Sequence, residues 1–451
     1  MFVGGFTLTA AEAVCNSDGK LDILDGVTSL VNNSLLWQEA MPNDEPRFFM
    51  LETIRAYAVE RLTESGEYDA LHAGHAQYFG NIILNEAGPQ LYSANAPHWL
   101  GWLEREHDNI RATLAWSQSN PAMVEFAAGL DMSLVGFWYR RGYFSEGRMW
   151  SGRLLNSSEV KTSQAPRALA LMANALMAIW QGEQDLALAL LKESQDIWND
   201  LKIEQHKALI TLGTGIALIN KGHDREAQPM LQESQKLFKE QNHSFFYVLS
   251  IVHLGNIELG LGNTEQARIL HEEAQIEARA LNDNWLLSFA LNNLGEVARV
   301  QGIYDLARKY YEESDSLLTD TGDDGDKARF VHNLGYIAQY EEEFDLAENQ
   351  FRKSLKMFRR LGNRRGMTEC MAGLAGLKAR QGLTEWGAVL LTAAESLLKT
   401  TGGAWWPADR LEVERNQEMI RTALGDEKWM AAQKKGTAMT LEQALAFASE
   451  S

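Results

Sequence analysis

The sequence is poor in cysteine, in proline and in long apolar runs. Its two cysteines, Cys15 and Cys370, lie far apart among 451 residues, which excludes a disulfide framework and a cysteine-based zinc set and favours a reducing compartment. Only 8 prolines occur, which favours helix. No apolar run approaches the roughly 18 residues that a membrane-spanning helix needs, and the N-terminus lacks the basic residues of a signal peptide. We therefore expect a cytoplasmic protein with no membrane contact.

Basic residues are also scarce: 42 Lys and Arg face 61 Asp and Glu, for a net charge of -19. Nonspecific affinity for nucleic acid comes from Lys and Arg side chains that neutralise phosphates. Direct binding of nucleic acid by this chain is therefore not expected.

The motifs of common enzyme sites are missing as well. No G-x-x-x-x-G-K-[ST] phosphate loop occurs. His72 and His75 sit one helical turn apart but have no third ligand for a metal. His107, Asp108 and Asn109 have no serine or cysteine nucleophile beside them, and we interpret them as a structural hydrogen-bonded cluster. We predict a non-enzymatic protein without cofactor or metal.

What the sequence does contain is a long repeat. A glycine recurs every 40 residues from Gly182 to Gly382, and only Glu342 breaks the series. Small residues recur seven positions before, five after and twelve after each member of the row. Such columns indicate an array of helix–turn–helix units that pack closely. The pattern resembles the tetratricopeptide repeat, although that repeat has a period of about 34 residues. We predict a mainly α fold, a tetratricopeptide-type solenoid with six repeats over residues 161–400.

Residues 1–66 have a different pattern, which predicts a small winged-helix-like module. The expected elements are helices over Thr9–Cys15 (with Thr9 as N-cap and Glu12 completing a capping box), Leu21–Asn33 and Glu52–Leu62, and a hairpin of Ser34–Gln38 and Arg47–Leu51 around the turn MPNDEP. The second helix contains Asp22 and Asp25 but no Lys or Arg. It therefore lacks the donors of a DNA-recognition helix, and we expect a structural or interdomain role.

Two further regions complete the predicted organisation. Residues 67–160 form a helical arm with a degenerate first repeat, marked by Gly142, and residues 401–451 form a C-terminal helical cap. The expected helices are Leu71–Ala87, Trp99–Ser117, Met123–Tyr139, Phe144–Leu155, Asp409–Leu424, Lys428–Lys435 and Leu441–Ser449.

Three stretches carry a family resemblance. VGGFTLTAAEAVC (Val3–Cys15) and RFFMLETIRAYAVERL (Arg47–Leu62) resemble the winged-helix segment of bacterial signal-transduction ATPases of the STAND class, and LEREHDNIRATLAW (Leu103–Trp116) resembles the helical segment that follows it. In that family an NB-ARC-like ATPase domain precedes the winged helix, and tetratricopeptide repeats follow the arm. Many members are transcriptional regulators. The resemblance implies the sensor arm of such a protein, with the ATPase core upstream of this chain.

The first helix of each repeat is expected to line a groove. Its polar end would be formed by His253, Asn256, Asn292, Asn293, Glu296, Arg299, Arg329, His332, Asn333, Tyr336 and Tyr340. Asn can pair with a peptide backbone as donor and acceptor, and Arg can hold a carboxylate or phosphate with two hydrogen bonds. We predict that this groove binds a peptide, a protein partner or a small effector. The alternative function is a free-standing tetratricopeptide adaptor for protein–protein interaction.

The basic stretch Arg352–Arg365 allows two interpretations. It could bind nucleic acid or an acidic partner, or it could be a solvated helix face that offsets the acidic stretches Asp320–Asp326 and Glu341–Asp345.

Overall fold

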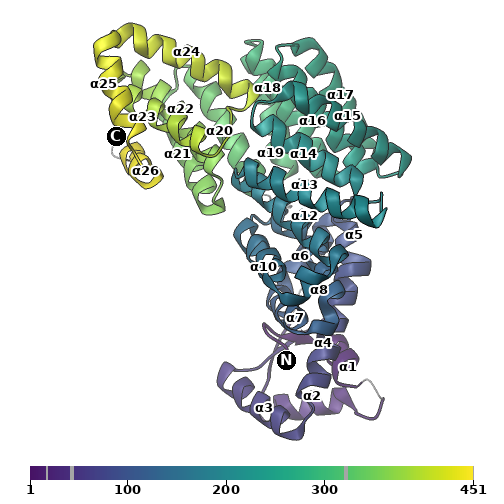
Figure 1. Ribbon diagram of the computed structural model, residues 1–451. Helices are drawn as coiled ribbons and strands as arrows, with labels where there is room; N and C mark the ends of the chain where they lie inside the picture. The colour runs from purple at the N-terminus through teal and green to yellow at the C-terminus, as the bar shows by residue number, and fades with distance from the viewer. Residues whose placement is uncertain (17–18, 41–44, 319–323, 450–451) are drawn as a thin grey trace. The chain divides into compact units, whose positions relative to one another are not determined.

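The computed structural model of the protein describes residues 1–16, 19–40, 45–318 and 324–449. It divides into two compact units, which we describe separately (Figure 1). Unit 1 comprises Met1–Gly136 and Trp150–Ala170, and unit 2 comprises Phe137–Met149 and Leu171–Ser451. The boundaries at 66, 160 and 400 that the sequence suggests remain predictions. None of the helices in the described ranges combines the length and apolar character needed to cross a membrane.

The first part of unit 1 is a winged-helix module, as predicted. Its elements are β1 (Phe6–Thr7), α1 (Leu8–Cys15), α2 (Ile23–Asn32), β2 (Trp37–Glu39), β3 (Arg47–Phe49) and α3 (Glu52–Ser65). The strands form an antiparallel sheet in the order β1-β3-β2, in which Phe48 pairs with Phe6 and with Gln38. Strand β1 was not predicted because two residues show no alternation. Residues 41–44 of the predicted turn lie outside the described residues.

One predicted cap in this module is wrong. The N-cap of α1 is Thr7, whose hydroxyl accepts a hydrogen bond from the Ala10 N–H at 3.1 Å. The backbone N–H of Thr9 instead donates to Glu45, at 2.9 Å. The helix therefore begins earlier than the capping-box pattern suggests, because Thr7 already satisfies an N–H of its first turn.

The rest of unit 1 is a helical arm that is more broken than predicted. The elements from here to the repeats are α4 (Tyr68–Ile82), η1 (Ile83–Ala87), α5 (Gly88–Gln90), α6 (Ala96–Arg105), α7 (His107–Ser119), η2 (Pro121–Met123), α8 (Val124–Ser133), α9 (Val135–Arg140), α10 (Phe144–Asn156) and α11 (Ser158–Thr162). The single helices expected over Trp99–Ser117 and Met123–Tyr139 are each divided. At Glu106, where the first one breaks, φ is -95° and ψ is 8°, and the Glu106 carboxylate pairs with Arg47.

Unit 2 is the predicted solenoid. Within its described residues the pairs are α12 (Gln164–Gln181) with α13 (Gln184–Leu201), α14 (Lys207–Asn220) with α15 (Asp224–Glu240), α16 (Ser244–Gly260) with α17 (Thr264–Ala280), α18 (Asn284–Val300) with α19 (Tyr304–Leu317), α20 (Asp324–Tyr340) with α21 (Phe344–Leu361), and α22 (Arg364–Arg380) with α23 (Thr384–Thr400). From α14 to α22, successive first helices contact one another, so they form the inner face of the array.

The glycine row is explained by the turn inside each pair. The five glycines of the row have φ between 75° and 92°, and Glu342 keeps the same left-handed conformation at a φ of 61°. Because this region favours glycine over residues with a Cβ, the break in the row is a strained substitution within an unchanged turn.

Two of the small-residue columns also have a physical cause. Seven residues before the turn, a Cβ on Gly255, Gly295 or Gly335 would come closer than 3.0 Å to an aromatic or imidazole ring of the second helix. Twelve residues after the turn, a serine hydroxyl donates to a carbonyl of the first helix. These bonds are Ser234 to Ala208, Ser314 to Ser288, and Ser354 to Ala328, at 3.1, 2.6 and 2.7 Å.

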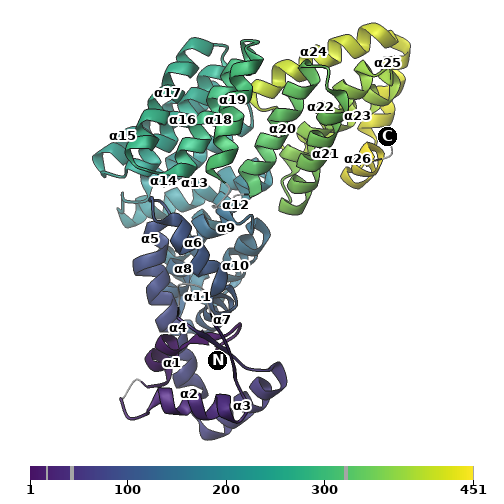
Figure 2. The ribbon, with the colours of Figure 1, turned by 180° about the vertical axis from the view of Figure 1, so that it is seen from behind.

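Three helices follow the pairs: α24 (Pro407–Leu424), α25 (Asp426–Thr437) and α26 (Leu441–Ser449). Helices α25 and α26 pack against α23, as a terminal cap would. Helix α24 does more than cap the array. It begins beside α16 and α18 and then runs along α22 and α23, as both views show (Figures 1 and 2).

Candidate functional site

The centre of the inner face is a buried carboxylate surrounded by cations. Asp409, near the start of α24, accepts from Arg299 of α18 at 2.6 Å and lies 3.0 Å from His332 Nε2 and 3.3 Å from Arg329 Nη1, both on α20. The side chains of Asp409 and Arg299 are 1% and 0% exposed. Such a cluster is stable only while its charges stay paired.

The indole of Trp406 occupies a second place in the same cluster. Its ring N–H donates to Glu296, and its backbone N–H donates to Glu369 at 3.2 Å. The guanidinium groups of Arg329 and Arg365 lie over the ring, 5.4 and 5.1 Å from its centroid. Glu369 also pairs with Arg329 at 2.7 Å and with Arg365 at 3.0 Å. Trp406 is therefore held by cation–π contacts with two arginines and by hydrogen bonds to two glutamates.

The charges of the cluster shift one another's titration. Burial alone would raise the pKa of Asp409, but the charges of His332, Arg299 and Arg329 outweigh it and hold that pKa well below its usual range. Burial raises the pKa of Glu296, with partial compensation from Arg329. The surrounding cations thus favour the charged form of Asp409.

The residues Ala404–Glu412, which we call the inner segment, span several repeats. Further contacts are the Ala404 N–H to the Asn220 carbonyl at 2.8 Å, the Arg410 guanidinium to the Gly260 carbonyl, and the Tyr340 hydroxyl to Glu412. The segment is therefore bound by residues from α14, α16, α18, α20 and α22.

The structure brings most of the predicted groove residues into this cluster. Asn333 donates to Asn292 at 3.0 Å and to Glu296 at 3.3 Å, and the Arg299 guanidinium lies 4.6 Å from the ring centroid of Tyr336. Asn293 differs, because its amide donates along its own helix to the Phe289 carbonyl at 2.7 Å.

His253 and Asn256 lie on α16. The His253 ring meets that of Phe289 at a centroid distance of 5.8 Å.

Several buried polar atoms on the inner face have no hydrogen-bond partner within the described part of the chain. They are His253 Nδ1, both amide atoms of Asn256 and of Asn416, Asn293 Oδ1, Asn333 Oδ1 and Arg365 Nη2. A buried polar group left unpaired costs roughly 1–3 kcal/mol. These groups could pair with the backbone of a polypeptide placed against them.

The sequence prediction missed Arg365, Glu369, Trp406 and Asp409. A signal for two of them exists in the repeat phase, because Glu369 and Asp409 follow Arg329 at intervals of 40 residues. Helix α24 thus has the register of a seventh first helix. Arg365 was assigned to the basic stretch, Trp406 to the turn GGAWWP, and Asp409 to the start of a helix of the C-terminal cap, so none of the three was placed on the inner face.

The basic stretch Arg352–Arg365 has acidic and carbonyl partners. Arg352 pairs with Glu348 at 2.8 Å, Arg360 with Asp324 at 2.5 Å, and Arg359 with Glu442 at 3.3 Å. These contacts favour the interpretation as a charge-compensated helix face.

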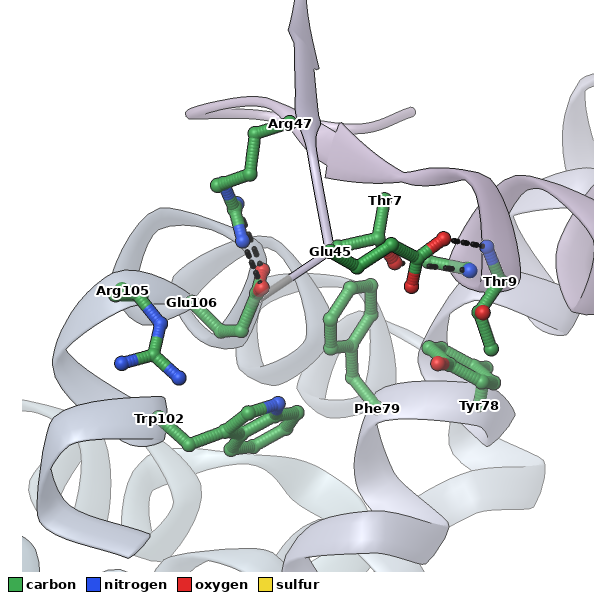
Figure 3. A pocket seen from close by; sticks show the side chains of 10 residues that line it. Thr7, Thr9, Glu45, Arg47, Tyr78, Phe79, Trp102, Arg105 and Glu106 are labelled. Carbon is green, nitrogen blue, oxygen red and sulfur yellow. Dashed lines mark hydrogen bonds and ion pairs between the residues drawn. The ribbon is translucent and has the colours of Figure 1, made fainter. Parts of the chain in front are cut away.

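Unit 1 has a buried ion pair of its own, shown in Figure 3. Arg47 of β3 makes two hydrogen bonds to Glu106, the second at 3.1 Å, and donates to the carbonyls of Gly4 and Gly5 at 3.3 and 3.2 Å. Asn109 donates to Glu106 at 2.7 Å and to Gly5 O at 3.0 Å. Of the three residues predicted to form a structural hydrogen-bonded cluster, Asn109 belongs to this buried network, whereas Asp108 pairs with the partly exposed Arg111 at 3.2 Å.

The Arg47–Glu106 pair borders a cavity of about 140 Å³, which is also lined by Tyr78, Trp102 and Arg105. His75 Nε2 lies 3.3 Å from Asn109 Oδ1, and burial lowers the pKa of His75 to about 4. Among the described residues, no group of three or more His, Cys, Asp or Glu is placed to hold a metal ion.

The winged-helix module also has an apolar cavity of about 660 Å³ among α1, α2 and α3. Leu21, Leu24, Leu51 and Tyr57 in and beside these helices are more than half exposed. Helix α3 has no buried residue.

Comparison with known proteins identifies part of the chain. Residues 1–63 match the model of the winged helix-turn-helix domain. A putative HTH-type transcriptional regulator of Mycobacterium bovis is 36% identical over 186 residues, which cover 40% of this chain and 20% of that protein, and one of Mycobacterium tuberculosis matches equally. The chain therefore spans about a fifth of the length of the curated relatives that it matches.

Among solved structures, a Rap protein complexed with competence and sporulation factor has a TM-score of 0.52 at 14% identity, covering 79% of this chain and 98% of that one. A STAND protein with a tetratricopeptide repeat sensor from Pyrococcus horikoshii has a TM-score of 0.43 at 13% identity, covering 95% and 63%. The first likeness supports the assignment of the fold.

Proposed function

We propose that this chain is the sensor arm of a transcriptional regulator, in which the inner face of the repeats receives a polypeptide effector. The chain carries out no chemistry in this proposal. Its relation to putative transcriptional regulators supports the regulatory role, and its repeat fold supports a binding role.

One observation carries the proposal. The inner face already holds a polypeptide stretch, the inner segment, through charged, aromatic and backbone contacts from successive first helices. Additional buried amide groups on the same face, such as those of Asn256 and Asn333, have atoms without a partner among the described residues. A face with this chemistry suits a peptide or protein segment better than an apolar small molecule.

The winged-helix module is assigned a role in protein contact. Helix α2 contains Asp25 and follows Asp22, and no Lys or Arg lies within it. Exposed Leu21 and Leu24 beside these acids are poor ligands for a phosphate backbone but suit an apolar protein surface. On this proposal the partner is an ATPase domain of the same regulator, which the resemblance to STAND proteins supports, and the regulator acts in the cytoplasm.

The test of the sensor role is selection of random 15-residue peptides on the immobilised full chain. Selected peptides should lose at least tenfold in affinity when Asn256→Leu or Asn333→Leu is introduced. Lys192→Ala, on the exposed side of α13, is the matched control and should bind as wild type. Selected peptides that bind both leucine variants unchanged would overturn the proposal.

A further inference from the structure

The inner segment is recognised in detail by the chain that carries it. Trp406 is the N-cap residue of α24, and Asp409 lies three residues later, with its backbone N–H donating to the Trp406 carbonyl at 2.9 Å. Each is held by side chains from more than one first helix: Trp406 by Glu296, Arg329 and Arg365, and Asp409 by Arg299, Arg329 and His332. This arrangement defines a binding site for an indole and a carboxylate at that spacing.

We propose that the inner segment is an exchangeable occupant of this site. The effector is then a polypeptide that presents an indole and a carboxylate three residues apart and takes the places of Trp406 and Asp409. This inference rests on the proposed sensor function and specifies its ligand class and its regulation.

The way the segment is anchored favours exchange. The buried residues of α24 in its first three turns are Asp409, Glu412 and Asn416, with Ala408 and Val413 as the apolar members. The apolar contact of the segment is one small cluster, in which Ala408 and Trp406 pack with Leu259, Ala267 and Val297. Contacts made by charges and hydrogen bonds can be replaced by equivalent contacts from another chain, because the same groups stay paired. A segment anchored by a large apolar core would leave that surface exposed when it departed.

The connection to the repeats permits movement of the segment. Between α23 and α24 the chain runs through Gly402, at a φ of 67°, and Gly403, without helical structure up to Trp406. Glycine residues allow large changes of φ and ψ at little steric cost. The first turns of α24 can therefore leave the inner face while α25 stays on α23.

Because the inner segment is covalently linked to the repeats, an effector needs a high affinity to displace it. A tethered segment competes at an effective concentration that reaches about millimolar for a short link. The wild-type chain should therefore bind a free copy of the segment weakly, and a chain whose own segment is disabled should bind it much more tightly.

The first experiment uses the full chain and a fluorescein-labelled synthetic peptide with the sequence of residues 403–416, followed by fluorescence anisotropy. The chain with Trp406→Ala and Asp409→Ala should bind this peptide at least tenfold more tightly than the wild-type chain. Adding Arg329→Ala should remove that gain, as should a peptide with Asn in place of its Asp. A folded double variant that binds no peptide, or binds it independently of Arg329, would overturn the proposal.

A second measurement needs no variant, so it decides the matter even if the double variant fails to fold. In the wild-type chain, amide hydrogen exchange over residues 404–412 should be at least tenfold faster than over α20, and an excess of the peptide should accelerate it further. If amide hydrogen exchange over residues 404–412 is as slow as over α20 and the peptide does not change it, the inner segment does not leave the inner face and the proposal is overturned.

The failure of this inference can be distinguished from failure of the sensor function. Selected peptides that depend on Asn256 and Asn333 but leave exchange over 404–412 unchanged would support a sensor whose inner segment does not move. If no such peptide is found, and if hydrogen exchange over residues 404–412 is as slow as over α20, both the sensor function and the displacement of the inner segment are overturned.

Discussion

The two units bury charge in different ways. In unit 1, Arg47 and Glu106 form one pair, and Arg47 has further acceptors in the carbonyls of Gly4 and Gly5. In unit 2, Arg299, Arg329 and Arg365 share Asp409 and Glu369, and nearby groups such as Asn416 have no partner among the described residues. The Arg47–Glu106 cluster, which we call the saturated joint, has all its charges paired and holds β3 against the arm. The cluster around Asp409 has polar groups left without a partner, which suits a site whose occupant changes.

The largest expected effect is at the saturated joint. Glu106→Gln leaves the Arg47 charge buried without its counter-ion, and breaking a buried pair in this way typically costs about 3–5 kcal/mol. Urea denaturation of the full chain should show this loss in unit 1, with peptide affinity of the inner face unchanged. The double variant Arg47→Met/Glu106→Met should lose less, because neither charge remains. Equal loss in both variants would show that the joint acts through shape alone.

Buried histidines should make both units sensitive to acid. Burial lowers the pKa of His75 and His253 to about 4 and that of His271 to about 3, while an unfolded histidine titrates near 6.5. Because the folded values are lowered, their stability contribution is present above about pH 6.5 and is lost as pH falls toward 4.

Between pH 6.5 and pH 4.5 each of these buried histidines lowers the stability by up to about 3 kcal/mol, because one pKa unit corresponds to about 1.4 kcal/mol. His271→Leu should flatten the fall of melting temperature between pH 7.5 and 4.5. His223→Leu, a substitution of a partly exposed histidine, should not. An unchanged slope in His271→Leu would contradict the assignment.

Asp409→Asn should be milder than Glu106→Gln, although Asp409 is equally buried. Glu369 remains paired with Arg329 and Arg365, and on the proposal above the inner segment can leave the inner face and admit water to Arg299. We expect a loss of about 1–2 kcal/mol by urea denaturation, accompanied by faster hydrogen exchange over residues 404–412. A loss as large as that in Glu106→Gln would contradict the contrast between the two clusters.

The smallest effect concerns the one turn without its glycine. Glu342→Gly relieves a left-handed backbone conformation and should stabilise unit 2 by about 1 kcal/mol. Glu341→Gly, which lies just before it, should be neutral or destabilising. A destabilised Glu342→Gly chain would mean that the Glu342 side chain has a role beyond the turn.

The repeat could be predicted from the sequence because its causes are local. Left-handed turns select glycine, and close approach of a ring selects Gly255, Gly295 and Gly335. The predicted groove residues likewise follow from helical phase. The contacts of the inner segment could not be predicted this way: the repeat phase places Asp409 in register with Arg329, but it does not show that Asp409 pairs with Arg299, 110 residues before it. The breaks at Glu106 and after Ser133 were missed for a related reason, since helical periodicity continues across both.

The central claim is that a peptide can displace the inner segment from the inner face, whereas the Arg47–Glu106 joint of unit 1 stays in place. Amide hydrogen exchange of the wild-type chain, with and without the peptide of residues 403–416, tests both at once. The account predicts that peptide accelerates exchange over residues 404–412 and leaves residues 104–110 and α20 unchanged. Uniform slow exchange over all three regions, with or without the peptide, would contradict it.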